Sequence, residues 1–192
     1  MGRPARFTDR DLIQATARIS AKLGPGNTTI GLIAEEAKAP IGSVYHRYPS
    51  KGALLAEAWI AAAEGFGAQF RATLAQAKDV ETALEAALVT PRFTRTDHAG
   101  GVLLFAHRRD DFLDEAPEES RARATKQTSG VLHSIAEAAK RLLPRDPRGR
   151  EKLAVALLGL PYGAVRIFLP HAVPPKELDA TIKAAARAAI VS

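Results

Sequence analysis

Polar and basic side chains that suit contact with a polyanion gather in one short stretch, between Thr28 and Lys51. Within it, the segment from Pro40 to Arg47 has the length of a very short helix and is followed by Pro49. If Val44 faces the core, the residues nearer the opposite side are Ile41, Gly42, Ser43, Tyr45, His46 and Arg47. A helix whose exposed residues are small or polar can enter the major groove of duplex DNA, which is about 12 Å wide. The pattern therefore indicates a DNA-reading helix.

The same side chains also have ordinary structural interpretations. Tyr45 fits a core aromatic residue, His46 an incidental surface histidine, and Lys51 a solvated lysine. Gly42 costs a helix roughly 1 kcal/mol relative to alanine, which makes sense where the backbone closely approaches another molecule, and DNA is one candidate. Arg3 and Arg6 fit either an arm in the minor groove or a solvated tail.

Three short helices would position this segment. We expect the first to begin at Thr8, whose hydroxyl can cap it, and to stop at residues 24–26, which read Gly-Pro-Gly. A second short helix follows a cap at Thr28 or Thr29, and the third takes Pro40 as its first residue, where the missing N–H is not needed. Two short helices joined by a tight turn and braced by a third are suited to reading the major groove.

The rest of the chain also predicts helices, because Ala-rich stretches occur at helical spacing and long alternating Val/Ile/Thr runs are absent. Ser50 caps a long helix that passes through Leu74, and its free N–H groups, with the ammonium of Lys51, suit one phosphate. Further helices are expected near residues 80–90, 97–109, 118–143, 148–169 and 175–190, separated by prolines at 91, 117, 144, 147, 170, 174 and 175. The fold class is therefore all-α, with about nine helices.

Charge is distributed unevenly along the chain. The net charge is +6, and residues 1–52 carry eight basic and four acidic residues, a net of +4, which leaves +2 for the other 140 residues. The basic excess thus falls on the segment expected to contact DNA.

Composition also excludes several classes of protein. The chain has no cysteine, which rules out a disulfide framework, cysteine-ligated zinc and thiol catalysis. The first seven residues lack the apolar run of a secretory signal, and the apolar stretch Leu153–Val165 is shorter than the roughly 20 residues of a membrane span. We expect a cytoplasmic protein with no membrane partner.

The stretch around these residues resembles the helix-turn-helix of the TetR family of transcriptional regulators. The resemblance rests on Thr28–Ile30, Ile33–Ala37 and Gly42–Lys51, within a match over roughly residues 8–60. It implies an all-α fold with a DNA-binding domain at residues 1–55 and a ligand-sensing and dimerisation domain at residues 56–192. The remaining residues agree with the family only in being helical and of suitable length.

The resemblance also assigns roles to individual residues. Thr29 would cap the second helix and touch a phosphate, and Tyr45 and Lys51 would reach backbone phosphates. Ser43 and His46 occupy positions that usually face bases or backbone. The full set of expected DNA-binding residues is Thr29, Lys38, Ser43, Tyr45, His46, Arg47 and Lys51.

The chain departs from the family pattern in several places. Lys38 stands where the turn glycine is usual, so the turn either differs in conformation or brings an extra cation near the DNA. Pro40 and Ile41 replace small polar or basic residues, which disfavours base contacts at the start of the reading helix. Gly31 and Leu32 replace a common charged pair, and Gly52 replaces an acidic residue.

By the same resemblance, the second half encloses a small-molecule pocket and its last two helices pair with a second copy. Its large apolar residues recur at helical spacing and are mostly core, with polar residues among them. The expected pocket residues are Phe70, Leu104, His107, Gln127, His133, Tyr162 and Arg166. We expect a ligand-responsive repressor that binds a palindromic operator as a homodimer and is released by an effector that shifts its conformational population.

Two other interpretations of the sequence compete with a ligand-responsive repressor. An enzyme is disfavoured because the acidic pairs at 110–111 and 118–119 fall at helix ends, and because phosphate-binding glycine loops, nucleophile elbows and metal-ligand spacings are absent. No cofactor or metal is expected. A DNA-binding protein without ligand control is the alternative, and sequence-independent binding would favour it.

Overall fold

The computed structural model describes residues 7–191, and these residues form helices with no β-strand among them. The first elements are α1 (Asp9–Leu23), α2 (Ile30–Glu36), α3 (Ile41–Arg47) and α4 (Lys51–Gln76). Next come α5 (Val80–Ala87), α6 (Val89–Thr96), α7 (His98–Phe105), α8 (Asp110–Leu113) and α9 (Glu118–Leu142). The chain ends with α10 (Gly149–Ala154), a π-helical turn (Val155–Gly159), α11 (Leu160–Arg166) and α12 (Leu178–Val191). The all-α prediction is confirmed.

Local hydrogen bonds begin and end the first helix as expected. The Thr8 hydroxyl accepts from the Asp11 backbone N–H at 3.2 Å, and the Asp11 carboxylate accepts from the Thr8 N–H at 2.7 Å. The Thr8 N–H and the Thr8 hydroxyl both donate to the Asp11 carboxylate, and these two bonds hold the pKa of Asp11 below its usual value because they stabilise the charged form. Gly24 follows the helix with φ +80, a left-handed conformation that glycine adopts at little cost.

The next three helices also begin at identifiable N-cap residues, and for α2 the cap is one of two neighbouring threonines. Thr29 is the cap, since its hydroxyl accepts from the Leu32 N–H at 3.2 Å, whereas the buried Thr28 hydroxyl bonds the Gly24 carbonyl. Helix α3 begins one residue later than expected, because Pro40 is its N-cap, with extended backbone, rather than its first residue. Ser50 caps α4 as predicted, accepting from the Ala53 N–H at 3.1 Å.

More helical segments are present than the nine expected, because three stretches are divided differently. The interval 80–90 becomes α5, with α6 beginning directly after it, and Pro91 lies in the first turn of α6 instead of breaking the chain. A proline in the first turn does not disrupt a helix, since its N–H would have no intrahelical partner there. The interval 97–109 contains only α7, with the short α8 following, and the π-helical turn separates α10 from α11.

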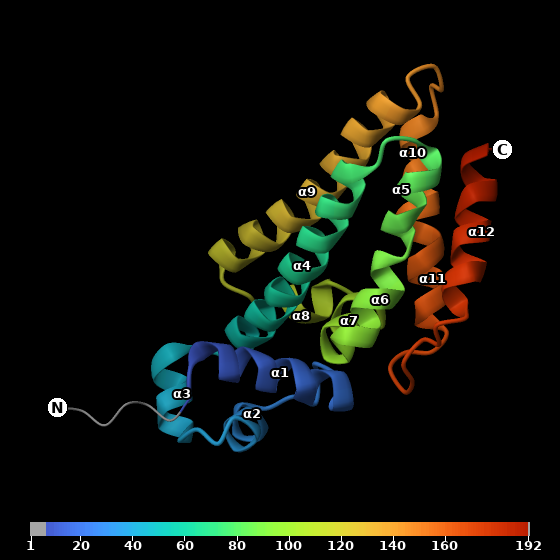
Figure 1. The fold of residues 1–192 in the computed structure, drawn as a ribbon. Coiled ribbons are helices and arrows are strands. Elements are labelled where there is room, and N and C mark those ends of the chain that lie inside the picture. Colours follow the sequence, from blue (N-terminus) through green and yellow to red (C-terminus); the bar gives the residue numbers. More distant parts are fainter. Residues whose placement is uncertain (1–6, 192) are drawn as a thin grey trace.

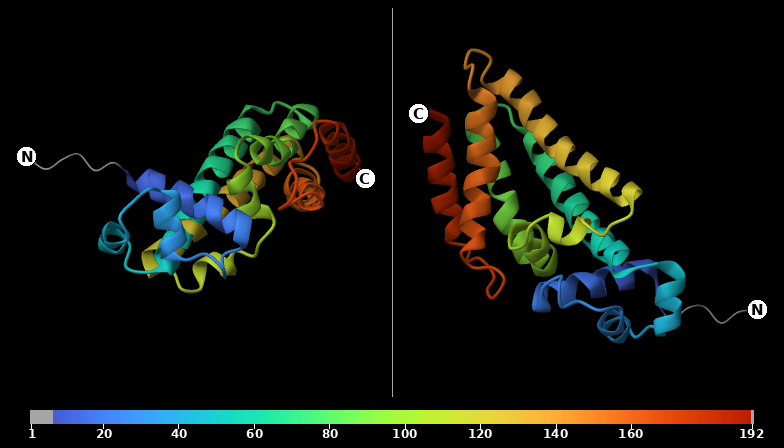
Figure 2. Two further views of the ribbon diagram at one scale, coloured as in Figure 1. Left: turned by 90° about the horizontal axis from the view of Figure 1, so that it is seen from below. Right: turned by 180° about the vertical axis from the view of Figure 1, so that it is seen from behind.

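The helices form two parts (Figure 1). Helices α1, α2 and α3 lie together at one end, and the long helices α4 and α9 run side by side away from them, with α10–α12 on the far side and the C-terminus distant from α3. Figure 2 shows the same separation from behind. Leu54 belongs to the hydrophobic core of α1–α3, whereas Leu55 belongs to the core around α4 and α8. Helix α4 therefore connects both parts without a break.

None of the helices within residues 7–191 is long and apolar enough to cross a membrane.

Candidate DNA-binding surface and ligand cavity

One side of α3 is fixed to the core of the N-terminal part. Val44 is fully buried and packs in the same cluster as Leu12 and Ile33, and Tyr48 lies partly buried against that cluster. Burial also raises the pKa of the Tyr48 phenol above its usual value. Because these anchors hold only one side of such a short helix, the other side faces outward.

The outward side of α3 presents apolar and polar residues together. Tyr45 is 55% exposed and Ile41 is 51% exposed, and His46 is exposed beside them. No heavy atom lies within 4 Å of the point where a side chain on Gly42 would begin, so the backbone is accessible there. Ile41 was left out of the expected DNA contacts, and its exposure on this side, one turn before Tyr45, is the feature that points to it.

Arg47 is engaged inside the N-terminal part. Its guanidinium bonds the Asp9 carboxylate at 3.0 Å and lies over the Phe7 ring, 4.7 Å from the centroid. Ser43, also on α3, is partly buried. Of the expected α3 contacts, Tyr45 and His46 are thus the two most free to touch a partner.

The turn between α2 and α3 has a left-handed residue at the site of the usual glycine. Lys38 is exposed and has φ +53, a conformation that costs side-chain-bearing residues roughly 1–2 kcal/mol. The turn thus keeps a conformation suited to glycine while carrying a lysine. The turn therefore has the conformation that a glycine would give it. Lys38 differs from glycine by adding a cation at the surface.

Thr29 and Lys51 lie at the beginnings of α2 and α4. Thr29 is exposed, although its hydroxyl is used as the cap. The Lys51 ammonium lies 3.5 Å from the Gly26 carbonyl, at the limit of a hydrogen bond, and remains available to a stronger partner. Arg3 and Arg6 lie outside the described residues.

Gly52 has a packing explanation. A side chain at this position would overlap the backbone carbonyl of Glu115, in the loop between α8 and α9. An acidic residue cannot be accommodated where α4 passes this close to the loop. This contact also ties the first turn of α4 to the C-terminal part.

The C-terminal part contains an apolar cavity of about 190 Å³. Its walls come from α4, α7, α9, the π-helical turn and α11, and include Trp59, Leu104, Gln127, Leu132 and Tyr162. Phe66 and Phe105, also in the wall, pack edge to face with centroids 5.3 Å apart. A small apolar or aromatic molecule fits such a lining, with the Gln127 amide as a polar group.

The other expected pocket residues lie away from this cavity in the described structure. Phe70 is fully buried in the core beside Phe66, and His133 is exposed on α9. Arg166 donates to the Tyr162 hydroxyl at 3.0 Å from the solvent side. The fold thus brings Leu104, Gln127 and Tyr162 together, but not the other four.

His107, the fourth of these, packs between the two parts of the molecule. Its ring meets the Phe112 ring edge to face, and its buried Nε2 has no hydrogen-bond partner among residues 7–191. Desolvation lowers the pKa of this imidazole, which favours its neutral form. No group of three or more His, Asp or Glu residues within the described chain is arranged to hold a metal ion.

The last helices expose small and apolar residues on one surface. Along α10–α11, Val155, Gly159, Gly163 and Ile167 are exposed at four-residue spacing, and Ile167 is 81% exposed. On α12 the exposed residues include Ala184, Ala185 and Ala188. Small residues at this spacing permit close approach of another helix, and large exposed apolar residues mark interaction surfaces.

Comparisons with known proteins agree with this geometry. Residues 12–58 match the family model described as bacterial regulatory proteins, tetR family, which covers α1, α2, α3 and the start of α4. No curated protein matched the chain in sequence.

Similar solved structures extend along nearly the whole chain. PfmR from Thermus thermophilus, a TetR-family transcriptional regulator, superposes with a TM-score of 0.74 at 15% identity, covering 94% of this chain and 97% of its own. The fatty acid degradation regulator FadR from Bacillus halodurans gives 0.72 at 16% identity, over 95% and 94%. FadR from Bacillus subtilis, solved with stearoyl-CoA, gives 0.68 at 13% identity, over 96% of each chain. The chain thus matches the TetR family model over its first helices, and its overall fold is similar to that of solved TetR-family transcriptional regulators.

Proposed function

We propose that this protein is a ligand-responsive repressor that binds a palindromic operator as a homodimer and leaves it when a small molecule binds. Residues 1–55 would bind DNA, and residues 56–192 would bind the effector and the second copy. The proposal is carried by α3, a short helix anchored through Val44 on one side and exposed through Tyr45 and His46 on the other.

The DNA contacts we propose divide into two kinds. Lys38, Lys51 and Thr29 would hold phosphates, which supply affinity and its salt dependence but little sequence preference. Tyr45 would reach a phosphate, and Ser43 and His46 would face bases or backbone. Arg47 would need to exchange its ion pair with Asp9 for a phosphate.

A homodimer is needed because one seven-residue helix reads too few base pairs for specificity, whereas a two-fold pair reads two half-sites. The exposed surface of α11 and α12 supports this assembly, since Gly163, Ile167 and Ala185 have no covering element within the described protomer. The pairing would form a four-helix bundle with the second copy.

Effector control would act through α4, which runs from the DNA-binding part into the wall of the apolar cavity. A molecule in the cavity that favours one tilt of α4 shifts the spacing between the two α3 helices of the dimer. A coupling of about 1–3 kcal/mol between the two sites changes operator affinity roughly 5- to 150-fold.

The test begins with selection of bound fragments from sheared genomic DNA by the purified protein, followed by footprinting on the recovered duplex. A protected palindrome supports the proposal, and its loss on adding small aromatic molecules supports ligand control. Protection that persists with every added molecule would favour the alternative, DNA binding without ligand control. Salt-sensitive binding with no footprint would contradict operator recognition.

A further inference from the structure

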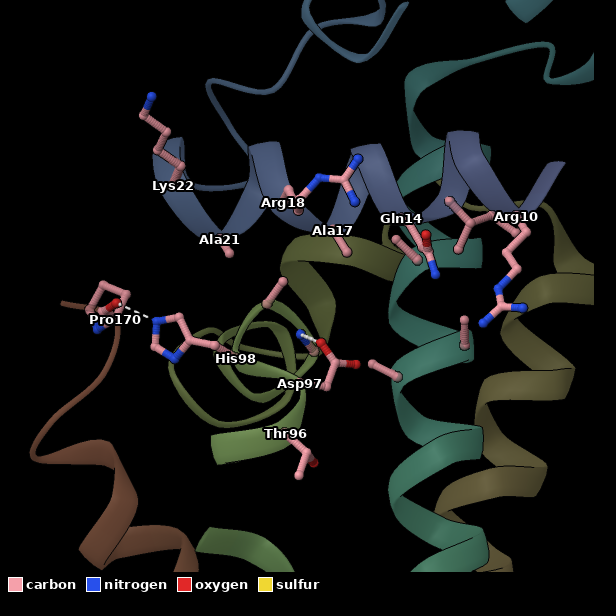
Figure 3. A pocket seen from close by; sticks show the side chains of 16 residues that line it. Arg10, Gln14, Ala17, Arg18, Ala21, Lys22, Thr96, Asp97, His98 and Pro170 are labelled. Carbon is pink, nitrogen blue, oxygen red and sulfur yellow. Dashed lines mark hydrogen bonds between the residues drawn. The ribbon is translucent and has the colours of Figure 1, made fainter. Parts of the chain in front are cut away.

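A second and larger hollow lies where the two parts of the molecule meet (Figure 3). This junction groove has a volume of about 1000 Å³ and runs between α1, α4 and the start of α7, with Pro170 at one end. It is separate from the apolar cavity, because Ala58, Ala61 and Ala62 line the groove from α4 whereas Trp59, Ala63 and Phe66 line the cavity. The two hollows thus lie on different faces of the same helix.

The walls of the junction groove are mainly apolar. Alanine methyl groups line it from both helices, Ala17 and Ala21 from α1 and Ala58, Ala61 and Ala62 from α4, beside the polar side chains of Gln14, Thr96 and His98. Small side chains leave the space between α1 and the C-terminal part unfilled, although α1 packs on α4 and α7. A flat or chain-like apolar group would fill this space.

Charges at the groove are predominantly positive. Arg10, Arg18 and Lys22 line it from α1, and Asp97 is the acidic residue that lines it. The Arg18 guanidinium is already paired with Glu36 at 2.6 Å, and the Asp97 carboxylate accepts the Gly100 N–H at 2.9 Å. Figure 3 shows Arg10 extending from α1 towards the groove, whereas the Lys22 ammonium extends away from it. Within residues 7–191, Arg10 has no hydrogen bond or ion pair, so it is the cation available to a ligand.

We propose that the junction groove binds an organic anion with an apolar body. The apolar part would lie between the alanine residues of α1 and α4, and the carboxylate would bind Arg10.

A ligand in this groove is placed to affect DNA binding, because α1 packs against both parts of the molecule through two different faces. Leu12 and Ala15 belong to the core that holds α3, whereas Ile13 and Ala17 pack towards the C-terminal part. A ligand in the groove would set the distance between α1 and α7 and carry α3 with it. This regulatory consequence rests on the proposed function, whereas the binding itself does not.

The test uses 2-naphthoate and its neutral analogue 2-naphthamide, titrated calorimetrically into the full-length protein without DNA. Wild type is expected to bind the carboxylate about tenfold more tightly than the amide, as for a charge-assisted hydrogen bond. Arg10→Gln removes this preference and leaves amide binding unchanged. Arg150→Gln, an exposed arginine on α10 outside the groove, is the matched control and keeps the preference.

Two filling variants identify the site. Ala61 is exposed on α4 in the groove, so Ala61→Trp should occupy it and weaken both ligands at least tenfold. Leu132→Trp, which fills the apolar cavity, removes binding there and should leave the Arg10-dependent preference for the carboxylate unchanged. Thermal melting checks that the variants remain folded, and Arg10→Gln provides an independent result if Ala61→Trp does not.

The proposal is overturned if wild type binds neither ligand up to roughly millimolar concentration, if the amide binds as well as the carboxylate, or if Leu132→Trp rather than Ala61→Trp abolishes the preference for the carboxylate. Because these titrations contain no DNA, a failure here leaves the proposed operator binding intact. Conversely, if the protein does not bind DNA, naphthoate binding is still expected, so the two failures are distinguishable.

Discussion

Replacing Lys38 by glycine should make the protein more stable while weakening its hold on DNA. Lys38 has φ +53, and a residue with a side chain pays roughly 1–2 kcal/mol in that conformation, which glycine avoids. Glycine also gives the unfolded chain more freedom, which offsets roughly 0.5–1 kcal/mol of the gain. The expected net stabilisation is about 0.5–1 kcal/mol, or an increase in Tm of roughly 1–4 °C for a chain of this size.

Lys38→Ala is the control that separates backbone from charge. Alanine removes the ammonium but keeps the Cβ, so it should not raise the Tm. Both variants lose one cation near the DNA, and each should reduce the slope of log K against log salt by about 0.9. Differential scanning calorimetry and fluorescence anisotropy on a footprinted duplex measure the two effects. If Lys38→Gly melts no higher than Lys38→Ala, the strain argument is wrong.

Four further outcomes are expected. Lys51→Ala should weaken binding to every duplex and flatten the salt slope by about one unit, and an unchanged slope would remove Lys51 from the phosphate contacts. Tyr45→Phe should lower operator affinity by roughly 0.5–1.5 kcal/mol without changing the elution volume of the protein, and undiminished binding would exclude a role for the hydroxyl. Ile167→Glu should convert the proposed dimer to monomers in sedimentation, while the protomer loses less than about 0.5 kcal/mol because this side chain is exposed; a dimer that persists contradicts the proposed interface. Gly52→Ala should destabilise the fold by about 1–3 kcal/mol, since its methyl group meets the Glu115 carbonyl, and an unaltered Tm would show that the loop moves freely.

The location of α3 and its outward side could be predicted from sequence because the determinants are local. The segment is short, prolines flank it, and Val44 is its only fully buried residue. What could not be predicted is which exposed side chains are already occupied. Arg47 pairs with Asp9, 38 positions earlier in the chain, and no local pattern reports that contact.

The lining of the apolar cavity could be predicted less well than the outward side of α3. Leu104, Gln127 and Tyr162 meet at the cavity, but Phe70, His107, His133 and Arg166 do not line it in the described structure. A polar residue within an apolar stretch shows only that its helix has a less buried face. Which face borders a cavity depends on how α4, α7 and α9 pack.

By itself, the sequence determined the elements that short-range bonds control. Thr8 and Ser50 begin helices and Gly24 follows the end of one, because each acts through hydrogen bonds or dihedral angles within three or four residues. Only the tertiary structure decided that Gly52 is required by a distant carbonyl and that α1 leaves a groove against α7. These features depend on contacts between segments far apart in the chain, and packing sets such contacts through shape and volume, which helical spacing does not encode.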